Sequence, residues 1–247
     1  MIETAQAFGV DIGGSGIKAA PVDLTKGDFA EPRLKILTPE VSTPQAVAKI
    51  VKQQLDHFEV PESAPVGIAF PAPIKPGQKL DFMANLDQSW IGVDVTEVFS
   101  EACGRPVVVV NDADAAGLAE VQFGAAKGQD GLVIATTLIY NGVLIPNTEL
   151  GHIILSAKHL DAEKYASSAI RENEELGYKK WAKRLTKYYG LMEKYFNPDL
   201  FTVGGGVSRQ SEKFLPYVDI KTPIVPAKLR NQAGIVGAAY YASTKQQ

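Results

Sequence analysis

Short apolar runs separated by turn residues open the chain. Residues 7–12 and 17–24 are two such runs, and Gly13 and Gly14 lie between them. Apolar runs of this length, bounded by glycine, are typical of β-strands, so the pair predicts a β-hairpin. Further strands are predicted at residues 33–37, 66–70, 107–110, 132–138, 143–145 and 200–203. The four valines at 107–110 are typical of a central strand covered on both faces.

Other segments have helical spacing. Thr43 followed by Pro44 predicts a helix start, with threonine as N-cap and proline in the first turn. Large apolar side chains recur every three or four residues from 178 to 196. The basic side chains of that helix fall mostly off the apolar stripe, which favours a solvated face over a polyanion track. An alanine-rich helix is expected after residue 111, and a tightly packed small-residue helix at 233–242.

The two halves of the chain resemble each other coarsely, since each contains a strand that ends in a glycine cluster. This pattern predicts an α/β protein of two related lobes with a cleft between them. We expect an N-terminal lobe of residues 1–110 and a C-terminal lobe of residues 111–233. A last helix, about 234–247, is expected to cross back to the first lobe.

Composition narrows the class of protein. The 247 residues are 45% hydrophobic and 21% charged, which suits a globular chain with a real core. A net charge of -3 argues against a dedicated nucleic-acid binder. A single cysteine, Cys103, excludes a disulfide scaffold and a cysteine-based zinc cluster. Without a long apolar run or a leader-like N-terminus, we expect a cytoplasmic protein with no membrane association.

The first glycine cluster is a candidate phosphate site. In the segment DIGGSGIK, residues 11–18, backbone N–H groups next to glycines can surround phosphate oxygens, and Asp11 can hold a Mg²⁺-bound water. A dinucleotide fingerprint fits poorly, because the chain continues as a strand rather than a helix. The alternative is an ordinary glycine hairpin.

A second candidate follows the valine strand. Asn111, Asp112 and Asp114 lie at its carboxyl end, where ligands bind in open α/β sheets. A carboxylate there can accept the proton of an attacking hydroxyl, as phosphoryl transfer requires. Alternatively, Asn111 or Asp112 is a helix N-cap, and one of the two acids is a structural acceptor.

Two more segments carry candidate chemistry. Glu149 and His152 are suited to binding vicinal sugar hydroxyls, although a simple surface pair is the alternative. No cysteine or second nearby histidine completes a zinc site or another protein-held metal cluster. The glycines at 204–206 follow a strand and either admit a ligand closely or form a tight turn.

Taken together, these segments resemble the ROK family of sugar kinases and repressors, which has the actin-like, ribonuclease H-like fold of two lobes. The matching segments are DIGGSGIK at 11–18, NDADAAGLAE at 111–120, ELGH at 149–152 and VGGGVS at 203–208, in the family's order. A closer resemblance is to the polyphosphate glucokinase subgroup, which includes glucomannokinases. It rests on FPAPIKPG at 70–77, ANLDQSWIGVDV at 84–95, IPNTELGH at 145–152 and TPIVPAKLRNQAGIVGAA at 222–239.

The resemblance implies transfer of a terminal phosphoryl group to the 6-hydroxyl of glucose, with mannose as a second candidate acceptor. It implies Mg²⁺, ATP or polyphosphate as donor, and no zinc. Asp112 matches the family's general base. Hexose-binding positions match Asn85, Asn111, Asp112, Glu149, His152 and, less closely, Glu163. The first phosphate loop matches Asp11, Gly13, Gly14, Ser15, Gly16 and Lys18, and the nucleotide side matches Gly204, Gly205 and Gly206.

One departure from the family concerns its second phosphate loop, of the type GTGIG. Here the strand expected at 132–138 runs directly into Ile139, with no turn residues before Tyr140. A deletion would remove N–H donors to the transferring phosphate. We therefore interpret the sequence as lacking, between Leu138 and Ile139, residues that the natural protein has.

Two further functions compete with a kinase. A ROK regulator needs an additional DNA-binding domain, for which we see no room before Asp11. A catalytically silent sugar sensor is favoured only if the second loop is truly absent. For a polyphosphate donor, the candidate basic track is Lys18, Lys127, Lys228 and Arg230. The oligomeric state is left open between monomer and homodimer.

Overall fold

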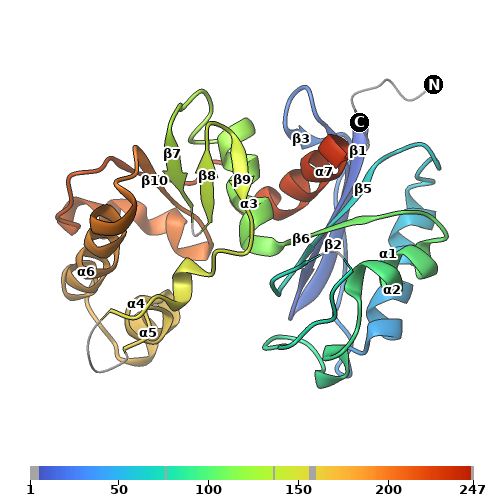
Figure 1. Ribbon diagram of the computed structural model, residues 1–247, viewed down its shortest axis with the longest axis horizontal. Helices are drawn as coiled ribbons and strands as arrows, with labels where there is room; N and C mark the ends of the chain where they lie inside the picture. Colours follow the sequence, from blue (N-terminus) through green and yellow to red (C-terminus); the bar gives the residue numbers. More distant parts are fainter. Residues whose placement is uncertain (1–5, 76, 136, 156–159, 246–247) are drawn as a thin grey trace.

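The computed structural model describes residues 6–75, 77–135, 137–155 and 160–245. Two β-sheets, each with its own helices, form two lobes that lie side by side (Figure 1). We call the lobe built on the six-stranded sheet the first lobe and the lobe built on the five-stranded sheet the second lobe. No helix among the described residues is long and apolar enough to cross a membrane.

The sheet of the first lobe has the order β3-β2-β1-β5-β6, with β4 also paired to β2. Its strands are β1 (Gln6–Gly13), β2 (Gly16–Asp23), β3 (Asp28–Phe29), β4 (Leu34–Ile36), β5 (Val66–Phe70) and β6 (Val108–Asn111). β1 and β2 form the antiparallel hairpin that the sequence predicts, while β5 and β6 run parallel to β1. Helices α1 (Pro44–His57) and α2 (Val95–Cys103) cover one face and enclose the largest apolar core.

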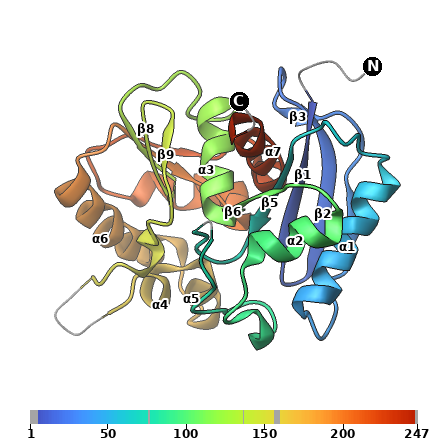
Figure 2. The same ribbon diagram turned by 45° about the vertical axis from the view of Figure 1, so that its right-hand side comes forward.

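The sheet of the second lobe has the order β11-β10-β7-β8-β9. Its strands are β7 (Leu132–Ile134), β8 (Leu138–Tyr140), β9 (Val143–Ile145), β10 (Leu200–Val203) and β11 (Ile224–Pro226). Helix α6 (Tyr178–Phe196) packs its apolar stripe on one face, and α4 (Glu163–Ala166) and α5 (Ser168–Asn173) lie beside it (Figure 2). Short 3₁₀ segments occur at Gln88–Trp90, Leu150–His152, Gly206–Lys213, Leu215–Tyr217 and Arg230–Gln232.

Helices α3 (Asp112–Gln122) and α7 (Ala233–Lys245) lie between the two sheets and pack against each other (Figure 1). The close contacts of α7 with β5 and with α3 require glycine. A Cβ on Gly67 of β5 would lie 1.9 Å from the carbonyl oxygen of Ala238, and one on Gly237 of α7 would lie 1.8 Å from that of Ala115. Backbone therefore meets backbone at this interface, which fixes α3 closely against the first lobe.

Most elements predicted from the pattern are confirmed, but the strand predicted at 132–138 is wrong. The chain reverses direction between Ile134 and Leu138, and β7 and β8 pair antiparallel. Leu138 and Ile139 are consecutive residues inside β8, so the turn lies before Leu138 rather than after it. The helix expected at about 234–247 is confirmed from Ala233 to Lys245; residues 246–247 lie outside the described part of the chain.

Candidate functional site

A cavity of about 800 Å³ lies between the lobes. Its walls come from the segment that follows β5, the start of α3, and the segment from β9 to α4. All six candidate hexose-binding residues line it, namely Asn85, Asn111, Asp112, Glu149, His152 and Glu163. Side chains that are as much as 78 positions apart in sequence therefore meet at one cavity, as the resemblance implies.

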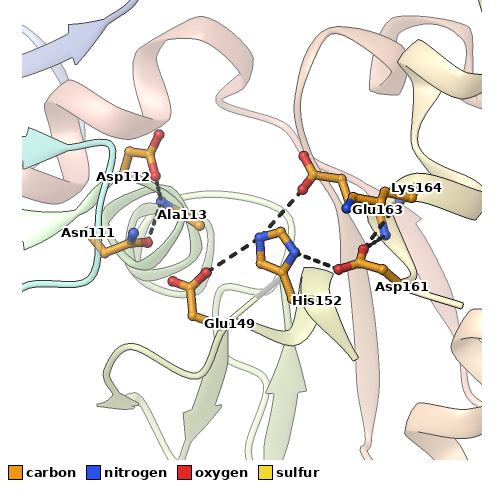
Figure 3. Close-up of polar contacts among 8 residues, drawn as sticks. All are labelled: Asn111, Asp112, Ala113, Glu149, His152, Asp161, Glu163 and Lys164. Atoms are coloured by element: carbon orange, nitrogen blue, oxygen red, sulfur yellow. Dashed lines mark hydrogen bonds and ion pairs between the residues drawn. The ribbon is translucent and has the colours of Figure 1, made fainter. Parts of the chain in front are cut away.

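Asn111 and Asp112 are held by the start of α3. Asn111 is the N-cap, and its Oδ1 accepts hydrogen bonds from the backbone N–H groups of Ala113 (3.0 Å) and Asp114 (3.2 Å). Asp112 Oδ1 also accepts from the Ala113 N–H, at 2.8 Å (Figure 3). The capping interpretation is thus right for Asn111, which still lines the cavity.

The carboxyl group of Asp112 has a strongly perturbed pKa. The pKa is raised to about 6, mainly by burial and to a smaller extent by the negative charges of Asp11 and Glu149, against the lowering effect of the Ala113 hydrogen bond. Such a group is mostly ionised at neutral pH and yet is a stronger base than an ordinary aspartate. Its position and its basicity suit proton abstraction from a bound hydroxyl.

Of the two acids Asp112 and Asp114, Asp114 is the one that serves as a structural hydrogen-bond acceptor. Its side chain is 2% exposed. One carboxylate oxygen accepts a short hydrogen bond from the Thr137 hydroxyl, and the other accepts from the backbone N–H of Asn147 at 2.8 Å. Asp114 therefore joins α3 to the second sheet and to the segment that leads to Glu149.

His152 lies at the centre of a group of carboxylates (Figure 3). Its Nδ1 lies 3.1 Å from Asp161 Oδ2, and its Nε2 lies 3.5 Å from Glu163 Oε2 and 4.0 Å from Glu149 Oε2. The hydrogen bond with Asp161 is the main cause that raises the pKa of His152, and the nearby acids add to it. Donors and acceptors that converge in this way suit a polyhydroxyl ligand.

The sequence did not point to Asp161. His152, Asp161 and Glu163 each place a ligand atom within 4.8 Å of the others, a spacing that can hold a metal ion. Carboxylates complete this group where cysteine and a second histidine do not, so the expected absence of a protein-held metal site stays a prediction. The local signal was the helix start after Asp161, whose carboxylate accepts from the N–H groups of Glu163 and Lys164.

The β1–β2 hairpin brings the phosphate candidates together. Asp11 and Lys18 pair in register, and Lys18 Nζ donates to Asp11 Oδ2 at 2.9 Å. The Thr38 hydroxyl donates to the carbonyl oxygen of Gly13 at 2.6 Å and supports the turn. A Cβ on Gly14 would lie 3.5 Å from the backbone oxygen of Asn85, so the hairpin tip touches the segment that carries a hexose candidate.

The second glycine cluster is separate from this cavity. Gly204, Gly205 and Gly206 are exposed after β10, and none of them lines the cavity. Gly205 has a φ of 73°, and the Ser208 hydroxyl donates to its carbonyl oxygen at 2.8 Å. The turn interpretation accounts for this geometry, and the nucleotide role of the three glycines stays a prediction.

Comparison with known proteins places these residues in context. The ROK family matches residues 7–159 of the chain. The polyphosphate glucokinase of Mycobacterium tuberculosis (strain CDC 1551 / Oshkosh) is 44% identical over 241 aligned positions, which cover 94% of this chain and 89% of that protein. The 241 aligned positions are more than 94% of the 247 residues of this chain. The alignment therefore contains internal residues of the relative that have no counterpart here.

Solved structures agree with the fold. The inorganic polyphosphate/ATP-glucomannokinase from Arthrobacter sp. strain KM superposes with a TM-score of 0.86 and 41% identity, over 98% of this chain and 100% of that one. A ROK hexokinase from Thermus thermophilus superposes with a TM-score of 0.77 and 22% identity, over 98% and 99% of the two chains. The second likeness shows the fold alone.

Proposed function

The chain belongs to the ROK family, and from this premise we propose that it is a hexose kinase. The reaction transfers the terminal phosphoryl group of polyphosphate or ATP to the 6-hydroxyl of glucose and yields glucose 6-phosphate. The observation that carries this proposal is the half-buried carboxylate of Asp112, with its pKa raised to about 6, in the wall of a cavity lined by five further hexose candidates.

Asp112 acts as the general base in this proposal. Its carboxylate takes the proton of the 6-hydroxyl as that oxygen attacks the terminal phosphorus in line with the bridging oxygen. The bond from phosphorus to the bridging oxygen breaks, and the shortened donor leaves with the electron pair. Asn111, Glu149 and His152 orient the sugar hydroxyls, so that the reaction depends on positioning and electrostatics.

The donor phosphates are assigned to the β1–β2 hairpin. Lys18 supplies a positive charge there, and the glycine N–H groups supply donors. Asp11 is the residue that would hold a water of the Mg²⁺ ion accompanying the donor, since its carboxylate lies on this hairpin beside Lys18, at 2.9 Å from Nζ. When bound, Mg²⁺ neutralises charge on the donor oxygens.

A local basic surface supports polyphosphate as donor. Glu120, 3% exposed near the end of α3, accepts hydrogen bonds from the N–H groups of Ala125 (2.7 Å), Lys228 (3.0 Å) and Leu229 (2.6 Å). These bonds bring together the loops that carry Lys127 and Lys228, both of which are exposed. Both lysines lie near the C-terminal end of α3, and we assign them as candidate contacts of a donor that is longer than ATP.

Assays with both acceptors and both donors test the proposal. Glucose and mannose are each incubated with ATP and with polyphosphate, with and without Mg²⁺, and hexose 6-phosphate is measured. We expect glucose 6-phosphate from the wild type and a loss of roughly 10²–10⁴-fold in kcat for Asp112→Asn, with glucose binding retained. The matched control is Asp56→Asn, an exposed aspartate on α1. Substantial activity in Asp112→Asn would remove that residue from the base role.

A catalytically silent sugar sensor is the second candidate, and the missing second phosphate loop favours it. The raised pKa of Asp112 argues for a working base instead. If glucose binds and no donor yields hexose 6-phosphate, the sensor replaces the kinase. Several properties stay predictions. They are the use of mannose, the dependence on Mg²⁺, and the absence of zinc and of nucleic-acid binding. They also include the choice between monomer and homodimer, the cytoplasmic location and the lobe boundary near residue 110.

A further inference from the structure

Asn147 makes a paired contact between the two lobes. It lies in the segment between β9 and Glu149, on the second lobe. Its Oδ1 accepts a hydrogen bond from the backbone N–H of Ile74 at 2.8 Å, and its Nδ2 donates to the Ile74 carbonyl oxygen at 2.9 Å. Ile74 is buried in the segment that follows β5, on the first lobe. One side chain therefore satisfies both backbone groups of one residue across the cleft.

The backbone around Asn147 is held in an unusual conformation. Asn147 has a φ of 58° and Glu149 has a φ of 43°, so two residues that are not glycine occupy the left-handed region within three positions. This conformation costs free energy and persists where the surroundings hold it, which is common at functional sites. Here the surroundings include Asp114, which accepts from the Asn147 N–H at 2.8 Å.

These contacts connect the two halves of the hexose site. The segment that Asn147 holds on the first lobe continues to Asn85, which lines the cavity. On the second lobe, Glu149 and His152 follow Asn147 by two and five positions. Through Asp114, the same residue is also tied to the start of α3, where Asp112 lies.

We propose that Asn147 is a positioning residue for the sugar, which fixes the segment carrying Asn85 at its distance from Glu149 and His152. The inference rests on the proposed function, since it concerns the same cavity. The side chain of Asn147 bonds to the backbone of Ile74, so its role is to position the walls of the cavity. It lowers the entropic cost of ordering the cavity walls on sugar binding, because the two walls are already joined before glucose binds.

The test uses Asn147→Gly and Asn147→Ala in the full chain. Glycine removes the side chain and tolerates the positive φ, whereas alanine removes the side chain and adds backbone strain. We expect Asn147→Gly to raise the KM for glucose at least tenfold while the KM for the donor stays within twofold. The acid limb of the pH–rate profile stays in place, because Asp112 keeps its surroundings. The matched control is Asn197→Gly, an asparagine with a φ of 44° at the end of α6.

Hydrogen–deuterium exchange gives a readout that does not depend on catalysis. In Asn147→Gly, amides of residues 71–94 are expected to exchange faster than in the wild type, and Asn197→Gly is expected to leave them unchanged. An unchanged KM for glucose, or equal rises in the KM of both substrates, would overturn the proposal. So would unchanged exchange in residues 71–94. If the wild type forms no hexose 6-phosphate, the proposed function fails by itself, and exchange together with calorimetric titration of glucose still decides the role of Asn147.

Discussion

Lys18 and Asp11 face each other across the β1–β2 hairpin, with 2.9 Å between Nζ and Oδ2. The ammonium group offsets a carboxylate whose charge raises the pKa of Asp112. Lys18→Met exposes Asp112 to the full charge of Asp11, so we expect the acid limb of the pH–rate profile to move up. Asp11→Asn removes that charge and is expected to move the limb down. Shifts of roughly half a pH unit are expected in each direction.

Kinetics of both variants from pH 4.5 to 8 check these shifts. Movement of both limbs in the same direction would contradict the charge coupling between Asp11 and Asp112.

The pH dependence of the wild type follows from Asp112. Its pKa is raised by burial to about 6, and the base acts only when it is ionised. We therefore expect kcat/KM to fall tenfold per pH unit well below pH 6 and to reach a plateau above pH 7. The measurement is the pH profile at subsaturating glucose, with stability monitored at each pH. A limb near pH 4, the range of an ordinary aspartate, would show that burial does not tune this group.

His152 is expected to titrate above its usual range because of Asp161. Its folded-state pKa is raised, so the stability that the pair contributes is present below the unfolded pKa of about 6.5 and is lost as the pH rises through the folded value. This contribution is small, since both side chains are partly exposed. In Asp161→Asn the pKa of His152 is expected to fall toward 6.5. NMR titration of the imidazole measures it, and an unchanged value would exclude Asp161 as the main cause.

The glycine contacts of α7 predict a loss of stability on substitution. Gly67→Ala and Gly237→Ala would each place a Cβ within 2 Å of a backbone oxygen, so the helix must shift. We expect each variant to lose about 1–3 kcal/mol of unfolding free energy, as in overpacked cores. The matched control is Gly190→Ala in α6, where a Cβ meets open space and helix propensity predicts a gain of about 0.5–1 kcal/mol. Thermal unfolding compares the three, and equal melting temperatures would contradict the close packing.

The second phosphate loop has a direct test in the mass of the natural protein. The sequence corresponds to 26.6 kDa, and the aligned mycobacterial relative carries internal residues that it lacks. Because β8 runs without interruption through Leu138 and Ile139, the second loop belongs at the reversal between Ile134 and Leu138, and we expect an intact mass above 26.6 kDa. An intact mass near 26.6 kDa would instead establish a deletion, and it would favour the sugar sensor over the kinase.

Much of the fold could be predicted because local signals agreed with packing. The apolar stripe of α6 predicts its bounds, and Thr43 caps α1 as expected. Helix α2 was missed although its signals are present: Asp94 accepts from the N–H of Thr96, and Gly104 ends the helix with a φ of 67°. The reversal before Leu138 carries no glycine or proline, and Thr137 is held there by Asp114, which is distant in sequence.

The candidate site likewise contains residues that could be predicted from the sequence and residues that could not. Asp112 and the hexose candidates follow from motifs, because their residue types and order are specific. Asp161 was missed because its contact with His152 depends on a β-bridge between Ile154 and Asp161. No local sequence pattern predicts that bridge. Asn147 was part of a quoted motif, yet its role depends on Ile74, a residue 73 positions away. Contacts between the lobes are the part of the site that could not be predicted from a single sequence.

The place of α7 has a consequence for the order of events during synthesis. This helix packs on β1 and β5, yet the ribosome makes it after all strands of the second lobe. Until α7 emerges, the face of the first sheet that carries Ala7, Ala20 and Val22 lacks the helix that buries it. The second lobe can complete its own sheet earlier. The nascent chain therefore finishes its first lobe last, and the cleft takes its final form only when that late helix docks.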